Sequence, residues 1–344
     1  MHVPDGFIDA PVSAATAVVA AGAIAVSLRG ARRELDERTA PLAGLVAAFI
    51  FAVQMLNFPV AAGTSGHLLG GALAAILVGP YTGVLCVSVV LLMQGILFAD
   101  GGLTALGVNI TDMAITTTVV AYAVFRGLVK VLPRTRRSIT AASFTAALLS
   151  VPAAALVFTL LYSLGGTTDV SLTKVATAMI GVHLLIGVGE AAITALTVGA
   201  VIAVRPDLVH GARGLEQRLK LRVNGELVDA AAQLEPVAAR DTSRRKLWIG
   251  GLVASLLLAG FVSFYASSNP DGLEKVAADQ GIDRQTKEHA SADSPLADYG
   301  VRDVDDARLS GGLAGVIGVG VTVVAGTGVF WAVRKRRSTT SQAA

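Results

Sequence analysis

The sequence has few of the residues that define soluble, secreted or enzymatic proteins. Only 15% of its 344 residues are charged, whereas soluble domains carry roughly 25%. Its one cysteine, Cys86, lies in an apolar segment, so no disulfide framework is available and no compartment can be inferred from it. The GxxxxGK[ST] loop that binds nucleotide phosphates is missing, as are the HExxH, GxSxG and CxxC patterns of common enzymes. These absences exclude a P-loop ATPase and leave an intramembrane enzyme without motif support.

Long apolar runs dominate the chain instead. Hydrophobic residues make up 53% of it, the mean hydropathy is +0.65, and runs of about 20 apolar residues recur, as in membrane-spanning helices. We therefore expect an all-α integral membrane protein, with a seven-helix bundle followed by a two-helix unit. Gly79-Pro80 divides 67–99 into two short helices, which alternatively form one broken span. The expected spans are 8–28, 41–58, 67–80, 81–99, 108–125, 139–163, 174–204, 247–266 and 311–333.

Short basic clusters between these runs predict the orientation of the chain. Lys and Arg gather at cytoplasmic span ends, and every cluster falls on one side if the spans alternate and the N-terminus is extracytoplasmic and the C-terminus cytoplasmic. A cleaved signal peptide fits poorly, because the first arginine follows the first apolar run. The formal net charge of +3 thus needs no nucleic-acid partner. The clusters are Arg29, Arg32, Arg33 and Arg38; Arg126, Lys130, Arg134, Arg136 and Arg137; Arg205, Arg213 and Arg218; Arg244, Arg245 and Lys246; and Arg334, Lys335, Arg336 and Arg337.

The pattern of runs divides the chain near residue 205. Seven spans occupy 1–205, a polar cytoplasmic linker of mixed charge occupies 206–246, and two further spans occupy 247–337. The two spans enclose an acidic outside loop at 269–310, and a polar tail covers 338–344. An acidic loop raises the local cation concentration weakly, because salt screens it over about 8–10 Å. The loop is therefore either a weak cation attractor or a plain solvated connector.

The chain opens with MHVPDGFIDAP, in which a histidine directly follows the first methionine. The α-amine of Met1, the backbone nitrogen of His2 and an imidazole nitrogen of His2 close adjacent chelate rings and offer three nitrogens in one plane. Such nitrogens suit Co, Ni, Cu and Zn, and a planar set favours Ni(II) or Cu(II). The amine binds metal only after losing its proton, so affinity should rise with pH. The alternative is an untethered tail, although Pro4-Asp5-Gly6 predicts a turn that folds the terminus back toward the bundle.

A second histidine is expected on the same side of the membrane. His67 lies in AAGTSGHLLGG at the outside end of the third span, where the glycines allow close approach of the backbone. A lone histidine at a membrane edge is commonly an interfacial or packing residue. Its predicted meeting with the N-terminus makes a metal site formed by Met1, His2 and His67 as good an interpretation as a packing role, and both stay open.

Ionisable and polar residues inside the spans are the remaining candidates. His183 and Glu190 in HLLIGVGEA are seven residues apart and share one helix face, with Glu190 near mid-membrane. An ionisable group at that depth marks a functional site or forms an interhelical hydrogen bond. Asn109 and Asp112 in LGVNITDMA orient metal ligands or simply join helices.

Small residues repeat at a spacing of four on the first two spans. Such stripes usually pack helices within one chain and sometimes dock a partner subunit. Both interpretations stay open from the sequence. The residues are Ala17, Ala21 and Ala25 on the first span, and Gly44, Ala48 and Ala52 on the second.

Four motifs in this order, MHVPDGFI, GTSGHLLGG, ADGGLTALGVNITDMA and HLLIGVGEA, resemble the CbiM/NikM family over about residues 1–205. These proteins are the substrate-capture subunits of energy-coupling-factor (ECF) importers for cobalt and nickel. NPDGLEKVAADQG, between the last two spans, resembles the CbiN/NikN component with its PDGLE segment. The resemblance implies that the metal is bound by the terminal amine, by the backbone and side-chain nitrogens of the second residue, and by the later histidine. These positions match Met1, His2 and His67. It also implies a membrane coupling subunit and two ATP-binding subunits as partners, with no resident cofactor.

Two positions depart from the family pattern. Members often have a histidine where this chain has Asp100, and NxFNMA where it has NITDMA. Asp100 either tunes the charge of the site or faces water. Family members for cobalt and for nickel share the same ligands, so the ligand set does not show which metal this chain binds.

Two other functions stay open at this stage. In one, the chain alone is a secondary metal transporter and Glu190 is its proton-coupled carboxylate. In the other, it is a membrane anchor or sensor for which metal is incidental. A proton-coupled carrier predicts that Glu190→Gln abolishes coupling, and an anchor predicts that His67→Ala has no effect.

Overall fold

The computed structural model describes residues 1–36, 39–61, 63–213, 220–223, 226–229 and 242–341. Within these residues seven helices are long and apolar enough to cross a membrane, which confirms the all-α membrane class. The long helices are α1 (Ala10–Glu34), α4 (Pro80–Leu97), α6 (Thr117–Val131) with the preceding turns, α7 (Arg136–Gly165), α8 (Leu172–Val204), α9 (Thr242–Gly260) and α11 (Ala307–Ser341).

The remaining elements are short. Of these, α2, with 16 residues, is the longest. They are α2 (Thr39–Gln54), β1 (Phe58–Pro59), β2 (Ser65–Gly66), α3 (Gly71–Val78), α5 (Leu106–Asn109), the π-helical η1 (Ile110–Thr116), the 3₁₀ turns η2 (Pro206–Leu208), η3 (His210–Ala212), η5 (Val262–Tyr265), η6 (Asp283–Gln285) and η7 (Ala297–Tyr299), β3 (Lys220–Val223), β4 (Glu226–Asp229) and α10 (Gly272–Gln280).

The expected span 67–80 is wrong as a single helix. Only Gly71–Val78 is helical, and eight residues rise about 12 Å, too little to cross a bilayer. Residues 64–70 and every residue of α3 are buried, so protein rather than lipid surrounds this irregular backbone and the helix. The chain reverses at Gly79, where φ is +102°, and Gly83 of α4 then packs on the backbone of Ala75. The alternative of one broken span is therefore wrong as well.

Local chemistry sets several other helix ends. Asp9 caps α1 by accepting from Val12 N, and Thr135 caps α7 by accepting from Ser138 N. The second span ends at Gln54 rather than 58, because Phe58–Pro59 pairs antiparallel with Ser65–Gly66. The Glu34 carboxylate at the end of α1 accepts from Thr82 N at the start of α4.

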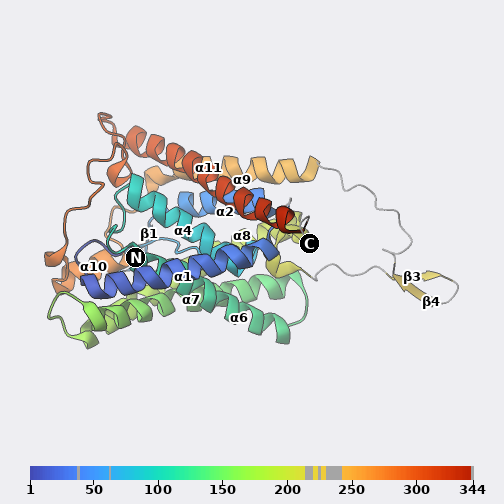
Figure 1. Ribbon diagram of the computed structural model, residues 1–344, viewed down its shortest axis with the longest axis horizontal. Coiled ribbons are helices and arrows are strands. Elements are labelled where there is room, and N and C mark those ends of the chain that lie inside the picture. The colour runs from blue at the N-terminus through green and yellow to red at the C-terminus, as the bar shows by residue number, and fades with distance from the viewer. Residues whose placement is uncertain (37–38, 62, 214–219, 224–225, 230–241, 342–344) are drawn as a thin grey trace.

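Helices α2, α9 and α11 pack together along one side of the molecule, and on another side α7 packs against both α6 and α8 (Figure 1). The small-residue stripes have different surroundings. Gly44 approaches α11 so closely that an added Cβ would lie 2.4 Å from the Thr327 hydroxyl. The α1 stripe is exposed on the surface of the bundle. Its members are Ala17, Ala21 and Ala25, whereas Gly44, Ala48 and Ala52 are buried.

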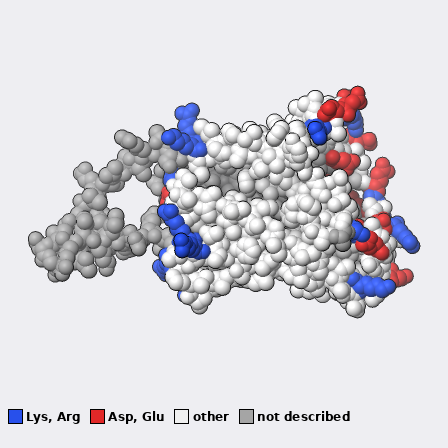
Figure 2. All heavy atoms as spheres, turned by 180° about the vertical axis from the view of Figure 1, so that it is seen from behind, with Lys and Arg blue, Asp and Glu red and all other residues white. Residues whose placement is uncertain are grey.

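The two ends of the bundle differ in charge. Figure 2 shows mainly Lys and Arg at one end, next to the atoms not described, and Asp and Glu mixed with basic residues at the other, with a wide uncharged band between. The acidic end is formed by α10 and the loops around it, beside the N-terminus in Figure 1. Residues 214–219, 224–225 and 230–241 of the expected linker 206–246 and the end of the expected tail lie outside the described residues, and α11 extends to Ser341.

Candidate metal centre

The N-terminal segment is held inside the bundle. Met1 and Phe7 are each 2% exposed and Val3 is fully buried. Asn109 pairs with the backbone of Val3 at both ends of its amide: Val3 N donates to Asn109 Oδ1 at 2.7 Å, and Asn109 Nδ2 donates to Val3 O at 3.1 Å. Asn109 therefore fixes the terminus two residues from the amine, and the untethered tail is excluded.

The expected turn at Pro4-Asp5-Gly6 is present, and both the first 205 residues and the C-terminal unit hydrogen-bond to it. The Asp5 carboxylate accepts from Leu103 N and Thr104 N, while Lys287 N donates to Asp5 O at 2.9 Å. Gly6 has φ of +95°, and a Cβ there would lie 2.1 Å from Gln285 O. A side chain at this position would therefore separate the N-terminus from the C-terminal unit.

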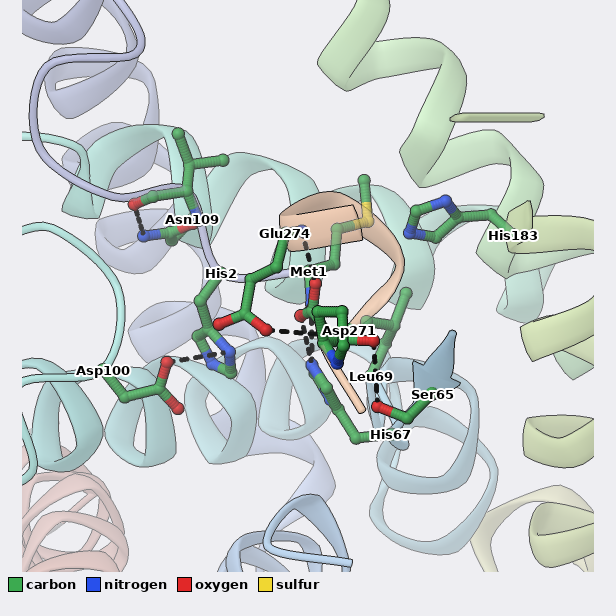
Figure 3. Close-up of polar contacts among 12 residues, drawn as sticks. Met1, His2, Ser65, His67, Leu69, Asp100, Asn109, His183, Asp271 and Glu274 are labelled. Carbon is green, nitrogen blue, oxygen red and sulfur yellow. Dashed lines mark hydrogen bonds and ion pairs between the residues drawn. The ribbon is translucent and has the colours of Figure 1, made fainter. Parts of the chain in front are cut away.

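The terminal amine and His67 form the centre of the site (Figure 3). Met1 N lies 2.7 Å from His67 Nε2, and both groups are buried. His67 Nδ1 lies 3.0 Å from Leu68 O, to which it donates, so Nε2 keeps its lone pair. Two nitrogens bound at right angles to one metal ion at about 2.0–2.1 Å are about 2.9 Å apart. The pair is joined by a hydrogen bond at 2.7 Å, which is about 0.2 Å shorter than that ligand spacing.

The His2 ring stacks on the His67 ring, with centroids 5.1 Å apart and planes at 22°. Burial lowers the pKa of His2 to about 4, despite the opposing effect of Asp100, so the ring carries one proton near neutral pH. Its Nε2 lies 3.1 Å from Gln94 Oε1, and its Nδ1 lies 3.3 Å from Asp100 Oδ1. Only one ring nitrogen can donate.

A chain of hydrogen bonds selects that nitrogen. Tyr299 Oη donates to Asp100 Oδ2 at 2.6 Å and accepts from Gln94 Nε2 at 2.9 Å. The Gln94 oxygen is thereby directed at His2, so Nε2 is the protonated atom and Nδ1 has the free lone pair. Asp100 therefore lies at the site, and the alternative that it simply faces water is wrong. Tyr299 belongs to the C-terminal unit and was not identified from the sequence.

A carboxylate that sequence analysis did not single out touches the claw, by which we mean Met1 N, His2 and His67 together. Asp271 Oδ2 lies 2.5 Å from Met1 N and 3.4 Å from His67 Nε2. Burial alone would raise the pKa of Asp271, but the terminal ammonium and His67 hold it well below its usual value. Asp271 is therefore ionised. The Asp-x-x-Glu spacing in NPDGLE is a readable helix-capping signal, but no local pattern shows that it meets residue 1.

The other expected residues lie behind the claw. Glu190 accepts from Leu69 N at 2.7 Å and Gly70 N at 3.2 Å, and so holds the backbone that follows His67. His183 is buried and donates its Nδ1 proton to Met179 O, while its Nε2 has no hydrogen-bond partner within the described part of the chain. Asp112 is buried in η1 and neither carboxylate oxygen has a partner there. The structure does not bring Asp112 into contact with the claw.

A cavity of about 610 Å³ opens beside the claw, between the first 205 residues and the C-terminal unit. His2, His67, Asp100 and Asp271 line it together with residues of α11. Among the described residues, no three His, Cys, Asp or Glu side chains gather closely enough to hold a metal ion by themselves. The metal site expected from the sequence differs from such a cluster, because it also uses the amine of Met1 and the backbone nitrogen of His2.

Known metal-transport proteins are similar to this chain in sequence. A putative metal transport protein of Haloquadratum walsbyi is 39% identical over 209 residues, covering 61% of this chain and 93% of that protein. A putative fused nickel transport protein NikMN of Archaeoglobus fulgidus is 40% identical over 211 residues, covering 61% and 68%. The cobalt transport protein CbiM of Geobacter sulfurreducens is 32% identical over 295 residues, covering 82% and 79%.

A solved structure and two family models also match this chain. The crystal structure of a truncated transition metal transporter superposes with a TM-score of 0.53 at 26% identity, covering 59% of this chain and 99% of that one. Residues 2–208 match the family CbiM, the cobalt uptake substrate-specific transmembrane region, and residues 245–335 match the PDGLE domain. The chain therefore belongs to the CbiM family of metal-transport membrane proteins, with a PDGLE domain joined to its C-terminal side.

Proposed function

We propose that this chain captures Co(II) or Ni(II) outside the cell and is the metal-specific subunit of an ECF importer. Met1 N, the backbone and ring nitrogens of His2, and His67 Nε2 are the ligands. The observation that supports this most directly is the 2.7 Å distance between the buried amine and His67 Nε2. The lone pair of Nε2 is available because the ring proton is on Nδ1, which donates to the Leu68 carbonyl. The names of relatives include both nickel and cobalt transport, and the claw itself does not choose between them.

The charge distribution supports capture from outside. Basic residues occupy the end of the bundle opposite the claw, which is the cytoplasmic end by the positive-inside rule. The N-terminus and α10 then face the exterior, and the C-terminus lies in the cytoplasm. The proposal divides the chain into a metal-capture unit (1–205), a cytoplasmic linker (206–246), and a two-span unit (247–337) with its outside loop (269–310).

Transport requires partners in this proposal: a membrane coupling subunit and two ATP-binding subunits. The chain has no P-loop of its own. The exposed stripe Ala17, Ala21 and Ala25 on α1 offers a small-residue face on which a partner helix packs closely. The stripe on α2 does not, because α11 of the same chain covers it.

Metal binding by the purified chain tests this function. We expect His2→Ala and His67→Ala each to weaken Co(II) and Ni(II) binding by at least about 100-fold, since each removes a ligand rather than an outer partner, whose loss typically costs 10–100-fold. Competition between the two metals in the same titration ranks them. His210→Ala is the matched control, because His210 contacts Tyr122 away from the claw. Unchanged affinity in both claw variants would contradict the proposal.

A milder effect is expected for Tyr299→Phe. The change removes the hydroxyl that accepts from Gln94 Nε2, so the amide is free to turn and the His2 proton is less firmly placed on Nε2. Because outer hydrogen-bond partners affect metal affinity by about 10–100-fold, we expect a loss at the lower end of that range. Isothermal titration of Ni(II) into the variant and the parent measures it, and an unchanged affinity would remove Tyr299 from the site.

A further inference from the structure

Asp271 is the point at which the C-terminal unit reaches the claw. We infer that Asp271 of the PDGLE domain is a positioning residue that supplies a fixed negative charge to the metal site formed by the first unit. The inference rests on the proposed function and adds to it a role for a specific carboxylate of the second unit. It is built from the position of Asp271, its contacts and the charge balance of the buried site.

The Asp271 carboxylate is fixed before it meets any metal. Asp271 is the N-cap of α10: its Oδ1 accepts from Glu274 N at 2.9 Å, and Glu274 Oε2 accepts from Asp271 N at 2.8 Å. This reciprocal pair occupies one carboxylate oxygen and leaves Oδ2 directed at Met1 N and His67 Nε2 (Figure 3). The geometry therefore assigns one oxygen to the helix and one to the claw.

The loop before α10 is joined to the loop that carries His67. Ser65 N donates to Pro270 O at 2.8 Å, and Ser65 Oγ donates to Asn269 O at the same distance. Gly272 packs against Val182, His183 and Ile186 of α8, where an added Cβ would lie 2.7 Å from Val182 and Ile186. The carboxylate and His67 are thus held by neighbouring backbone segments, which keeps their spacing constant.

Charge balance explains why a carboxylate belongs there. A buried charge is costly unless a partner compensates it. With the amine protonated, the ammonium and Asp271 sum to zero. With a divalent ion in place of the protons, the ion, the deprotonated backbone nitrogen of His2 and Asp271 again sum to zero. Asp271 therefore neutralises the site for either occupant, and an amide in its place would leave one positive charge uncompensated in both.

Asp100 is the other carboxylate at the claw, and its environment differs. Its side chain is 27% exposed, compared with 10% for Asp271, and one of its oxygens accepts from Tyr299. Solvent screens its charge, whereas Asp271 contacts two of the proposed ligand groups directly. Asp271 is therefore the carboxylate whose loss should affect the metal most.

The test is the affinity of the full purified chain for Ni(II) and Co(II) in Asp271→Asn. Asparagine is nearly isosteric and caps helices as well as aspartate, so α10 should keep its start. We expect an affinity loss of about 10–100-fold, the range found when partners of metal ligands are removed. Asp271→Glu restores the charge, and we expect its affinity to return to within about tenfold of the parent. Asp279→Asn, on the exposed side of the same helix, is the matched control with the same change of charge.

The outcomes separate this inference from the proposed function. If the parent chain binds neither metal, the proposed function fails. If the parent binds and Asp271→Asn binds equally or more tightly, Asp271 only competes with the metal for the amine, and the inference is overturned. If Asp271→Asn and Asp279→Asn lose affinity equally, a general surface potential explains both, and the inference is also overturned. A loss confined to Asp271→Asn and reversed by Asp271→Glu supports it.

Discussion

Adding one or two residues ahead of Met1 is expected to abolish tight binding of Ni(II) and Co(II). The addition converts the α-amine into an amide and moves the charged terminus away from His67 and Asp271. Met1 is 2% exposed, so the extra residue has no room without displacing the terminus from the bundle. We expect a loss on the order of 1,000-fold or more, which corresponds to about 4 kcal/mol.

The same purified protein gives the measurement and its control. Ni(II) titration compares the parent, the N-terminal extension and a chain with the same residues added after Ala344, which should bind like the parent. Thermal unfolding without metal shows whether the extension also loosens the fold through the lost Met1–Asp271 ion pair. Tight binding by a chain verified to retain its extension would show that the amine is not a ligand.

The bundle could be predicted from the sequence because lipid imposes long apolar helices with basic ends on one side. The exception is 67–80, where the requirement for apolar helix is relaxed. Protein surrounds α3, so an irregular segment and an eight-residue helix can take the place of a full-length span there. Hydropathy reports only that such a segment is apolar, and does not report whether lipid or protein surrounds it.

The claw could be predicted in part for a similar reason. Met1 and His2 are adjacent, and topology placed His67 on their side of the membrane. Asp271 and Tyr299 follow after more than 200 residues and depend on how the second unit packs against the first. Their contacts with Met1 and Asp100 are tertiary, and no spacing within the sequence encodes them.

The sequence left Glu190 open between a transport carboxylate and a structural one. Its hydrogen bonds to Leu69 N and Gly70 N favour the structural role, because both carboxylate oxygens already accept from buried backbone N–H groups. This arrangement is also what places His67, two residues earlier in the chain. A single residue of α8 thereby connects stability to the metal site.

Glu190→Ala is therefore expected to reduce both stability and metal affinity. The substitution leaves two buried N–H groups without an acceptor and opens a cavity, which together cost about 3–5 kcal/mol. Glu190→Gln keeps one acceptor oxygen but turns an NH₂ group toward the second N–H, so we expect a loss of about 1–3 kcal/mol. In both variants the His67 loop is less well held, and Ni(II) affinity should fall in the same order.

Thermal unfolding in detergent, with and without Ni(II), measures both effects, and Leu196→Ala is the control. Leu196 lies on the same helix and is 74% exposed, so its truncation should change stability by less than about 0.5 kcal/mol. A proton-coupled carrier makes the opposite prediction, since its Glu190→Gln variant would fold and bind metal normally and lose only coupling to the proton gradient. Parental stability and affinity in Glu190→Gln would therefore favour the carrier. A larger loss of stability and Ni(II) affinity in Glu190→Ala than in Glu190→Gln would show that the carboxylate acts by holding the loop beneath the claw.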